Sequence, residues 1–237
     1  MFAERASGSN YVEALLMFNT GLQSTLFCHK HFPPWYDLPK EKYNGDSRCW
    51  SFENTDDILF VIVVRNPYDW LRSLHNQPHQ AEKSLKILPF HHFIRSPWKL
   101  DIRDPVIAED VQCNPLIDLN PSNGLPFANV MHLRTAKTKN FLQIQYKAKN
   151  VYYIRYETAR GNPKDVLDEL AKSYHIKINN VYQPIIHYKG HTALPLYERK
   201  EYAPISQNDL LFINSQLDKD LEDQLGYSLI TTAGSFD

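Results

Sequence analysis

The chain has 237 residues and a formal net charge of −1, with 43% hydrophobic and 22% charged residues. This length and composition predict one large or two small globular domains. The nearly neutral charge argues against a nucleic-acid partner bound by broad electrostatic attraction, although a few well-placed cations suffice for a small anion. No apolar run approaches the roughly 20 residues that a membrane-spanning helix requires.

The three cysteines, Cys28, Cys49 and Cys113, are odd in number and widely spaced. Their spacing predicts neither a disulfide framework nor a metal-ligand cluster. Residues 1–5 lack the apolar core of a signal peptide. These features favour a reducing cytoplasm as the location and predict no bound metal.

Strand and helix signals alternate along the chain, which predicts an α/β fold with a mostly parallel central sheet flanked by helices. The predicted strands, in chain order, are residues 1–5, 24–30, 58–64 and 151–155. The predicted helices are residues 11–19, 68–76, 133–147, 163–174 and 207–225. Residues 58–64 are uniformly apolar, as expected for a strand that is buried on both faces.

The region 78–129 is rich in proline, histidine and aromatic residues and shows no sustained periodicity. We expect it to be a lid or an acceptor-binding insertion within a single domain of residues 1–237.

A loop of small residues, Ser7-Gly8-Ser9-Asn10, precedes the first predicted helix. Consecutive backbone N–H groups and the partial positive charge of a helix N-terminus form an anion site. Gly8 lets the backbone approach a phosphate, and Ser7 and Ser9 offer hydroxyl donors. Arg5 can add a charge-assisted pair. The alternative is an ordinary helix cap, because serine and asparagine are common there in any protein.

A second anion-binding pattern follows the strand predicted for residues 58–64. Arg65 stands at its carboxyl end, where open α/β sheets place their ligands. Ser73 lies about two helical turns further on. Arginine offers a bidentate fork for phosphate, and serine a directed donor. The alternative is that Arg65 pairs with Asp69 and only stabilises the turn. Two such segments in one chain suggest a nucleotide that is phosphorylated at two ends.

These segments resemble the nucleotide-binding motifs of sulfotransferases that use 3′-phosphoadenosine 5′-phosphosulfate as co-substrate. Residues 65–73 match, position for position, the Arg-Asn-Pro-x-Asp-x-x-x-Ser segment that binds the 3′-phosphate. Residues 7–9 are similar to the Ser-Gly-Thr/Ser loop that binds the 5′-phosphosulfate. Lys189 and Gly190 resemble a Lys-Gly segment that contributes to the 3′-phosphate site.

Further similarity lies at Tyr156-Glu157, at Asn162-Pro163 and along residues 213–227. The resemblance covers most of the chain outside residues 78–129. It implies a P-loop-like sulfotransferase architecture and transfer of a sulfuryl group to a hydroxyl or amine of an acceptor, without a metal. The sequence departs from many members at Ala6, where they carry lysine or arginine, so Arg5 or Lys30 is expected to supply that charge.

The resemblance also points to a catalytic base. His31, in His29-Lys30-His31-Phe32-Pro33, is similar to the histidine of a Lys-x-His-x-Pro segment that supplies the base in many members. A histidine pKa near neutrality suits this role, and Lys30 can stabilise the bridging oxygen as the bond breaks. His29 is the competing base, and Glu13 or Glu53 would be a carboxylate alternative.

The acceptor is expected to be a small molecule or a glycan, bound under residues 78–129. Candidate wall residues are the aromatic side chains of this region together with one tryptophan before it: Trp35, Phe90, His91, His92, Phe93 and Trp98. Such side chains suit sugars or phenols, but they also suit ordinary packing. The sequence leaves the acceptor and the oligomeric state open.

Two other functions fit part of the pattern. A nucleotide or small-molecule kinase would need a triphosphate-loop lysine and a magnesium carboxylate, and the Gly-Lys-Ser/Thr ending of such a loop is absent. A non-catalytic nucleotide-binding or partner-binding module would keep the fold without turnover, and the departure at Ala6 is compatible with it.

Overall fold

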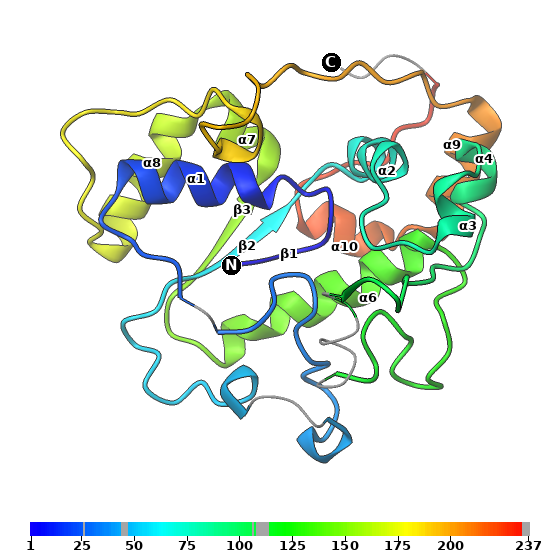
Figure 1. The fold of residues 1–237 in the computed structure, drawn as a ribbon, viewed down its shortest axis with the longest axis horizontal. Coiled ribbons are helices and arrows are strands. Elements are labelled where there is room, and N and C mark those ends of the chain that lie inside the picture. The colour runs from blue at the N-terminus through cyan, green and yellow to red at the C-terminus, as the bar shows by residue number, and fades with distance from the viewer. Residues whose placement is uncertain (26, 44–46, 106, 108–113, 234–237) are drawn as a thin grey trace.

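A parallel sheet of three strands lies at the centre of the computed structural model, which describes residues 1–25, 27–43, 47–105, 107 and 114–233 (Figure 1). The strands are β1 (Phe2–Ala3), β2 (Phe60–Val64) and β3 (Val151–Arg155), in the order β1-β2-β3. Ile62 of the central strand lies opposite Phe2 on one side and Tyr153 on the other. The carboxyl ends of all three strands therefore meet at one edge of the sheet.

Helices flank this sheet. They are α1 (Ser9–Asn19), α2 (Pro67–Asn76), α3 (Lys83–Lys86), α4 (Phe90–Phe93), α6 (Val130–Leu142), α7 (Tyr156–Gly161), α8 (Pro163–Tyr174), α9 (Gln207–Gln216) and α10 (Lys219–Gln224). Single 3-10 turns occur at η1 (Lys40–Lys42), η2 (Ser47–Cys49), η3 (Gln143–Tyr146) and η4 (Tyr188–Gly190). The predicted α/β class with a parallel sheet is thus confirmed. None of the described helices is long and apolar enough to cross a membrane.

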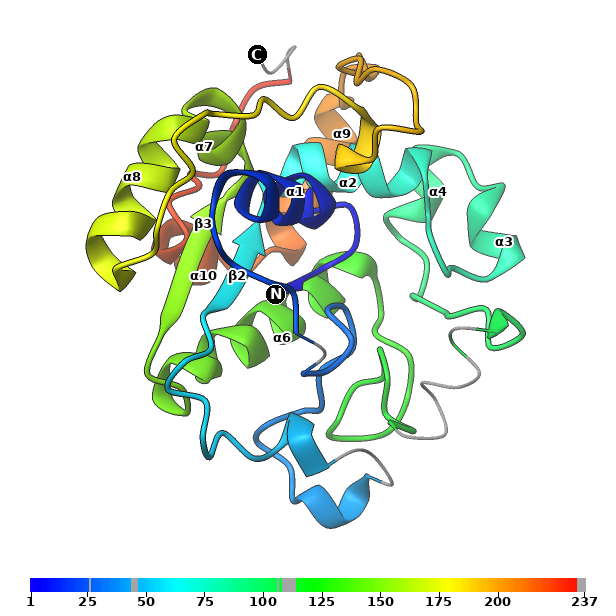
Figure 2. The same ribbon diagram turned by 60° about the vertical axis from the view of Figure 1, so that its left-hand side comes forward.

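The two faces of the sheet pack against different helices, which gives three layers (Figures 1 and 2). Val61 and Val63 of β2 belong to a buried cluster with α1, α7 and α8. Phe60, Ile62 and Val64 point the other way, toward α6, η3 and the residues that follow α10. All five residues of β2 are buried. The prediction of a strand buried on both faces is confirmed.

The strand predicted at residues 24–30 is wrong for the part of it that the structure describes. Residues 24, 25 and 27–30 have no strand conformation, and they reach β1 through one backbone hydrogen bond, from Ala3 N to Lys30 O (3.0 Å). The physical reason is the shortness of β1, which has only two residues and offers a neighbour no ladder to extend.

The helix predicted at residues 207–225 is also wrong, because the structure divides it into α9 and α10. Leu217 has extended backbone angles, and the Asp218 carboxylate accepts a hydrogen bond from Leu221 N (3.1 Å). Aspartate is a strong N-cap, and here its side chain starts a new helix instead of continuing the old one. Gly226, predicted as the helix stop, follows with φ +81°.

The described part of the predicted insertion at residues 78–129 packs against the body of the protein. Leu85, Phe93, Ile94 and Trp98 are buried in one apolar cluster with side chains of α2, α6 and α9. Phe93 and Trp98, both predicted to line an acceptor wall, are therefore core residues in the structure. Burial of large apolar groups of this kind ties the insertion to the scaffold.

A buried ion pair joins α6 to α10 underneath the end of β2. The Arg134 guanidinium donates to both Glu222 carboxylate oxygens at 2.7 and 2.9 Å, and the two side chains are 2% and 0% exposed. The same guanidinium donates to the backbone oxygen of Arg65 (2.9 Å). Arg134 thus fixes the backbone at the residue where β2 gives way to α2.

We predict that Arg134→Met destabilises the protein by about 3–5 kcal/mol, because it leaves the Glu222 carboxylate buried without its cation. Chemical denaturation measures the change. Lys139→Met on the same helix is the matched control, since Lys139 is 57% exposed and its pair with Asp218 should contribute at most about 1 kcal/mol. Equal, small losses in both variants would contradict this view of the ion pair.

Candidate functional site

The loop between β1 and α1 ends in a residue with left-handed backbone angles. Gly8 caps α1 with φ +81°, and Ala6 also has a positive φ of 61°. Within the described part of the chain, the N–H groups of Gly8, Ser9 and Asn10 have no hydrogen-bond acceptor. Three adjacent donors at a helix N-terminus form a concave site for an anion.

Side chains from the neighbouring segment donate to the loop carbonyl groups that lie before these donors. In a longer helix, Ser9 and Asn10 would donate to the carbonyl groups of Arg5 and Ala6. Both carbonyls are already engaged: the Trp70 indole donates to Arg5 O (2.7 Å), and Arg65 Nη1 donates to Ala6 O (3.0 Å). The loop and the segment after β2, predicted as two phosphate-binding elements, are therefore in direct contact.

Tyr156, the first residue of α7, closes the other side of the loop. Its ring lies so near Gly8 that a Cβ atom at this position would stand 2.1 Å from Tyr156 Cδ2. The Arg65 guanidinium lies over the same ring, 4.9 Å from its centroid. Gly8 is thus required both for its φ angle and for the space that its missing side chain leaves.

Arg65 is partly buried and retains an unused donor. Its Nε is buried without a hydrogen-bond partner among the described residues. The predicted alternative, an ion pair with Asp69, is not found within the described chain, where Asp69 pairs with Arg72 instead. An unsatisfied guanidinium nitrogen costs free energy in the folded protein unless a ligand or water meets it.

The turn from β2 into α2 forms as its sequence predicts. Asn66 caps α2, and its side-chain oxygen accepts from the backbone N–H of Tyr68 (3.0 Å). Asn66 N donates to Glu157, whose other carboxylate oxygen accepts from the Tyr227 hydroxyl (2.8 Å). These bonds join three segments that are far apart in the sequence, and so fix the direction in which α2 leaves the sheet.

The remaining predicted 3′-phosphate residues lie on α2 and on η4, which packs against α1. Ser73 is one turn before Gln77, and the Gln77 side chain accepts from the Tyr188 hydroxyl of η4 (2.8 Å). Gly190 touches α1 so closely that a Cβ atom would stand 2.2 Å from Ala14 Cβ. Lys189, between Tyr188 and Gly190 in η4, is exposed and has φ 54°. The structure thus brings η4 to both helices that the site would use.

Lys30 lies beside the first turn of α1. Its ammonium group donates to the Asn10 side chain and approaches Glu13 at 3.3 Å. Lys30 is therefore next to the loop, although its charge is shared with these two side chains. Glu13, one alternative base, serves as its partner, and Glu53, the other, is exposed.

His31 lies against β1, with Nδ1 2.6 Å from Ala3 O. A carbonyl oxygen only accepts, so Nδ1 carries the proton and Nε2 of the neutral ring keeps its lone pair. His29 has the opposite tautomer, because its Nδ1 accepts from His31 N (3.2 Å). Of the two histidines, His31 alone has Nε2 available to take a proton.

Burial and nearby cations keep both rings neutral. Burial, followed by the charges of Arg5 and Lys137, lowers the pKa of His29 to about 4. Burial and Arg5 also hold the pKa of His31 well below its usual value. The expected pKa near neutrality is therefore wrong for His31: the ring is neutral at physiological pH, but its lowered pKa makes it a weaker base than an exposed histidine.

Arg5 is 1% exposed and belongs to a buried network of four charges. It contacts Glu4 (2.9 Å) and Asp118 (2.8 Å), and Lys137 contacts both of these carboxylates at 2.8 and 2.7 Å. Burial alone would raise the pKa of Asp118, but the two cations outweigh it and lower that pKa. Arg5 also donates to Gln80 (2.9 Å), so most of its donors are engaged away from the loop.

Three residues that support the site could not be identified from the sequence. Trp70 and Arg134 hold backbone oxygens at the loop and at the end of β2, and Asp118 balances Arg5. Trp70 lies inside the segment matched to the sulfotransferase motif, at a position where the motif prescribes no residue type. Asp118 lies in the aperiodic region 78–129, where nothing in the sequence predicts its neighbours.

The predicted aromatic wall divides into packed and exposed side chains. Trp35, Phe93 and Trp98 are buried, and the indole N–H of Trp98 donates to Asp118 (2.9 Å). His91 and His92 are exposed on α4. The packed residues act as core, which is the alternative that the sequence left open.

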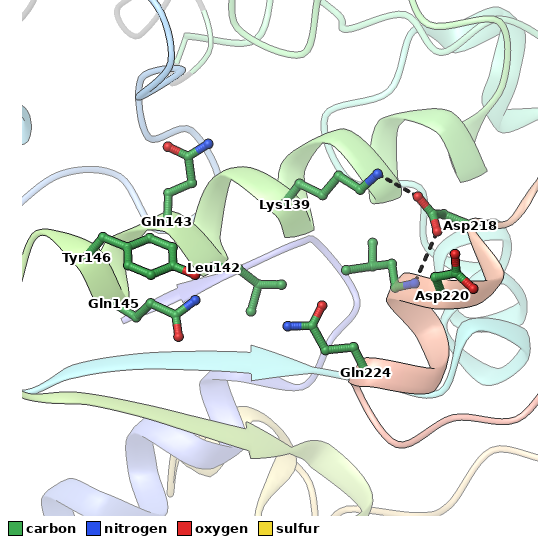
Figure 3. A pocket seen from close by; sticks show the side chains of 9 residues that line it. Lys139, Leu142, Gln143, Gln145, Tyr146, Asp218, Asp220 and Gln224 are labelled. Atoms are coloured by element: carbon green, nitrogen blue, oxygen red, sulfur yellow. Dashed lines mark hydrogen bonds and ion pairs between the residues drawn. The ribbon is translucent and has the colours of Figure 1, made fainter.

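A surface groove of about 360 Å³ lies between α6, η3 and α10, away from the predicted site residues (Figure 3). Lys139, Tyr146 and Asp218 line it, and Lys139 pairs with Asp218 at 2.6 Å. None of the predicted site residues borders it. Its walls mix polar and apolar side chains and are open to solvent, so we assign it no part in the chemistry of the loop.

Among the described residues, no group of three or more histidine, cysteine, aspartate or glutamate side chains is arranged to hold a metal ion. Comparisons with models of protein families, with curated proteins and with solved structures found no match for this chain.

We predict that Gly8→Ala costs about 2–4 kcal/mol of unfolding free energy, because the new methyl group meets both an unfavourable φ and the Tyr156 ring. Gly124→Ala is the matched control: Gly124 has φ +70° but open space around it, so only the backbone term of about 1 kcal/mol applies. Urea denaturation of the two variants separates these causes. A loss at Gly8 no larger than at Gly124 would show that Tyr156 does not confine the loop.

We predict that stability falls between pH 6.5 and about 4, partly through His29 and His31. In the unfolded chain both histidines bind a proton near pH 6.5, whereas the native pKa of His29 is about 4 and that of His31 is also lowered. Because the unfolded state binds more protons, the free energy of unfolding decreases as the pH drops.

The double variant His29→Asn, His31→Asn should flatten this part of the curve by on the order of 1–3 kcal/mol. His191→Asn, at an exposed position, is the control and should leave the slope unchanged. Denaturation at closely spaced pH values measures the slopes. Parallel curves for the wild type and the double variant would mean that neither ring is held neutral in the native state.

Proposed function

We propose that this protein is a sulfotransferase that takes a sulfuryl group from 3′-phosphoadenosine 5′-phosphosulfate and transfers it to a hydroxyl or amine of a small-molecule or glycan acceptor. The observation that carries the proposal is the contact between two anion-binding elements. The loop with three unpaired N–H donors and the Arg65 side chain meet at Ala6 O (3.0 Å). A nucleotide with phosphates at both ends would engage them together.

The loop is the proposed site of the 5′-phosphosulfate. Gly8, Ser9 and Asn10 present their N–H groups at the start of α1, where the helix dipole adds partial positive charge. A strand, a small-residue loop and a helix in this order, next to a parallel neighbour strand, support the P-loop-like sulfotransferase architecture that we propose for the fold.

The 3′-phosphate is proposed to bind between α2 and η4. Arg65 has a buried Nε without a partner in the described chain, which a phosphate oxygen would satisfy. Ser73 and Lys189 add a hydroxyl and an ammonium group, and Gly190 allows η4 to approach α1 closely enough to bring Lys189 there. An ATP molecule, which lacks a 3′-phosphate, would leave this part of the site unused.

In the proposed reaction, the acceptor oxygen or nitrogen attacks sulfur as the bond from sulfur to the bridging phosphate oxygen breaks. Adenosine 3′,5′-bisphosphate leaves with that electron pair. His31 Nε2 takes the proton of the acceptor, since Nδ1 is bound to Ala3 O. Lys30, beside Asn10, stabilises the charge that develops on the leaving oxygen. We assign this role to Lys30 because Arg5 is engaged by Glu4, Asp118 and Gln80.

Calorimetric titration with adenosine 3′,5′-bisphosphate, and with ATP with and without Mg²⁺, tests the proposal. We expect the bisphosphate to bind more tightly than ATP and independently of the metal. Preference for magnesium-ATP would indicate a kinase instead. Tight bisphosphate binding without transfer to any acceptor in a broad screen would indicate a non-catalytic nucleotide-binding module.

We predict that Arg65→Ala weakens bisphosphate binding by about 2–4 kcal/mol, which is roughly 30- to 1,000-fold, because it removes a partly buried charge pair with the 3′-phosphate. Calorimetry gives the affinities. Arg65→Lys keeps the positive charge but loses the bidentate guanidinium. Its affinity for the bisphosphate should therefore lie between those of the wild type and Arg65→Ala.

Arg103→Ala is the control for general electrostatics, since Arg103 is 69% exposed and pairs with Asp101. Arg65→Ala also removes the hydrogen bond to Ala6 O, so thermal unfolding of each variant checks that the fold itself is retained. Unchanged affinity in a folded Arg65→Ala protein would remove the 3′-phosphate site from the proposal.

A further inference from the structure

Two cysteines that are 21 positions apart in the sequence meet in the structure. Cys49 Sγ lies 3.3 Å from the backbone oxygen of Phe27, the residue that precedes Cys28. The two thiols also influence each other's ionisation, since the interaction with Cys49 raises the pKa of Cys28. Both are partly buried thiols that are not joined by a disulfide. Cys113, the third cysteine, lies outside the described residues.

Aromatic packing holds the two cysteine-bearing segments together. Phe27 packs against Phe52, with ring centroids 5.3 Å apart, and Trp50 packs edge-on against Tyr36 at 5.7 Å. These contacts join Phe27, which precedes Cys28, and Tyr36, further along the same segment, to the two aromatic residues that follow Cys49. The packing of these aromatic residues therefore determines how close the two thiols lie.

We infer that Cys28 and Cys49 form an oxidative modification site, at which a disulfide oxidant such as oxidised glutathione converts the two thiols into an intramolecular disulfide. One thiolate attacks oxidised glutathione, forms a mixed disulfide and releases one reduced glutathione. The second thiolate then attacks the protein sulfur of the mixed disulfide and releases the other. The protein loses two protons and two electrons, and one oxidised glutathione becomes two reduced molecules.

The new bond would close a ring that begins next to the candidate catalytic segment. Residues 29–31 follow Cys28 directly, and they include Lys30, which contacts Asn10, and His31, which contacts Ala3 O. Closure would fix the start of this segment to η2. The inference does not depend on the proposed function, because it uses only the thiols and their surroundings.

The surroundings also predict how the oxidation rate depends on pH. The interaction with Cys49, together with burial, raises the pKa of Cys28 well above its usual value. The thiolate is the nucleophile in disulfide exchange, so the rate should continue to increase with pH above the range in which an exposed cysteine levels off. This behaviour suits a site that responds to sustained oxidation.

The test is incubation of the full chain with oxidised glutathione at several pH values, followed by intact mass and peptide mapping. We expect a loss of two hydrogens, a peptide that links Cys28 to Cys49, and a rise in the unfolding temperature of about 5–10 °C that dithiothreitol reverses. Cys113→Ser should behave like the wild type.

The single variants Cys28→Ser and Cys49→Ser should instead stop at the mixed disulfide and show no such rise in temperature. A crosslink that includes Cys113, or mixed disulfides alone on the wild-type protein, would overturn the inference. If one serine variant fails to fold, trapping the wild-type thiols with iodoacetamide before oxidation gives the same comparison, because alkylation of either cysteine must abolish the crosslink.

Discussion

The attachment of α2 to the loop before α1 is the constraint on which the candidate site depends. Arg65 and Trp70 donate to two adjacent loop carbonyls, those of Ala6 and Arg5. These two bonds hold the loop backbone in place from outside. The first N–H groups of α1 are unpaired because a helix N-terminus has no preceding turn to accept from them. A site preorganised in this way needs little rearrangement to receive an anion.

Buried charges on either side of this attachment keep it rigid. Arg134, paired with Glu222, holds the backbone oxygen of Arg65. On the β1 side, Glu4 and Arg5 pair with Lys137 and Asp118 in a network that is almost fully enclosed. Buried ion pairs are expensive to form and contribute little net stability. Their value here is positional, since each network fixes one side of the loop.

Much of the fold could be predicted from periodicity and turn chemistry. The strand at Val151–Arg155 and the helix that opens at Pro163 have the predicted bounds, because an apolar run and an Asn-Pro start are local signals. The strand expected at residues 24–30 failed because strand formation needs a partner, and β1 is too short to be one. The division between α9 and α10 follows from the cap that Asp218 forms. The apolar pattern continues across this position, so periodicity alone predicted one helix.

The candidate site was predictable only in part, for a similar reason. The proposed roles of Arg65 and Gly8 follow from short sequence motifs, and the structure places their segments in contact. The neighbours of Arg5 come from region 78–129, which has no periodic signal, so its burial beside Asp118 could not be foreseen. Likewise, the spacing of Cys28 and Cys49 gave no sign that they meet, because their proximity is created by aromatic packing between two irregular segments.

The most direct test of the central claim is the backbone amide spectrum of the protein, recorded by NMR with and without adenosine 3′,5′-bisphosphate. We expect large downfield shifts and slowed hydrogen exchange for Gly8, Ser9 and Asn10, since a bound phosphate would accept from these unpaired donors. The Arg65 Nε–H should shift with them. Binding that leaves these four groups unchanged would contradict the claim that the loop before α1 is the phosphate site.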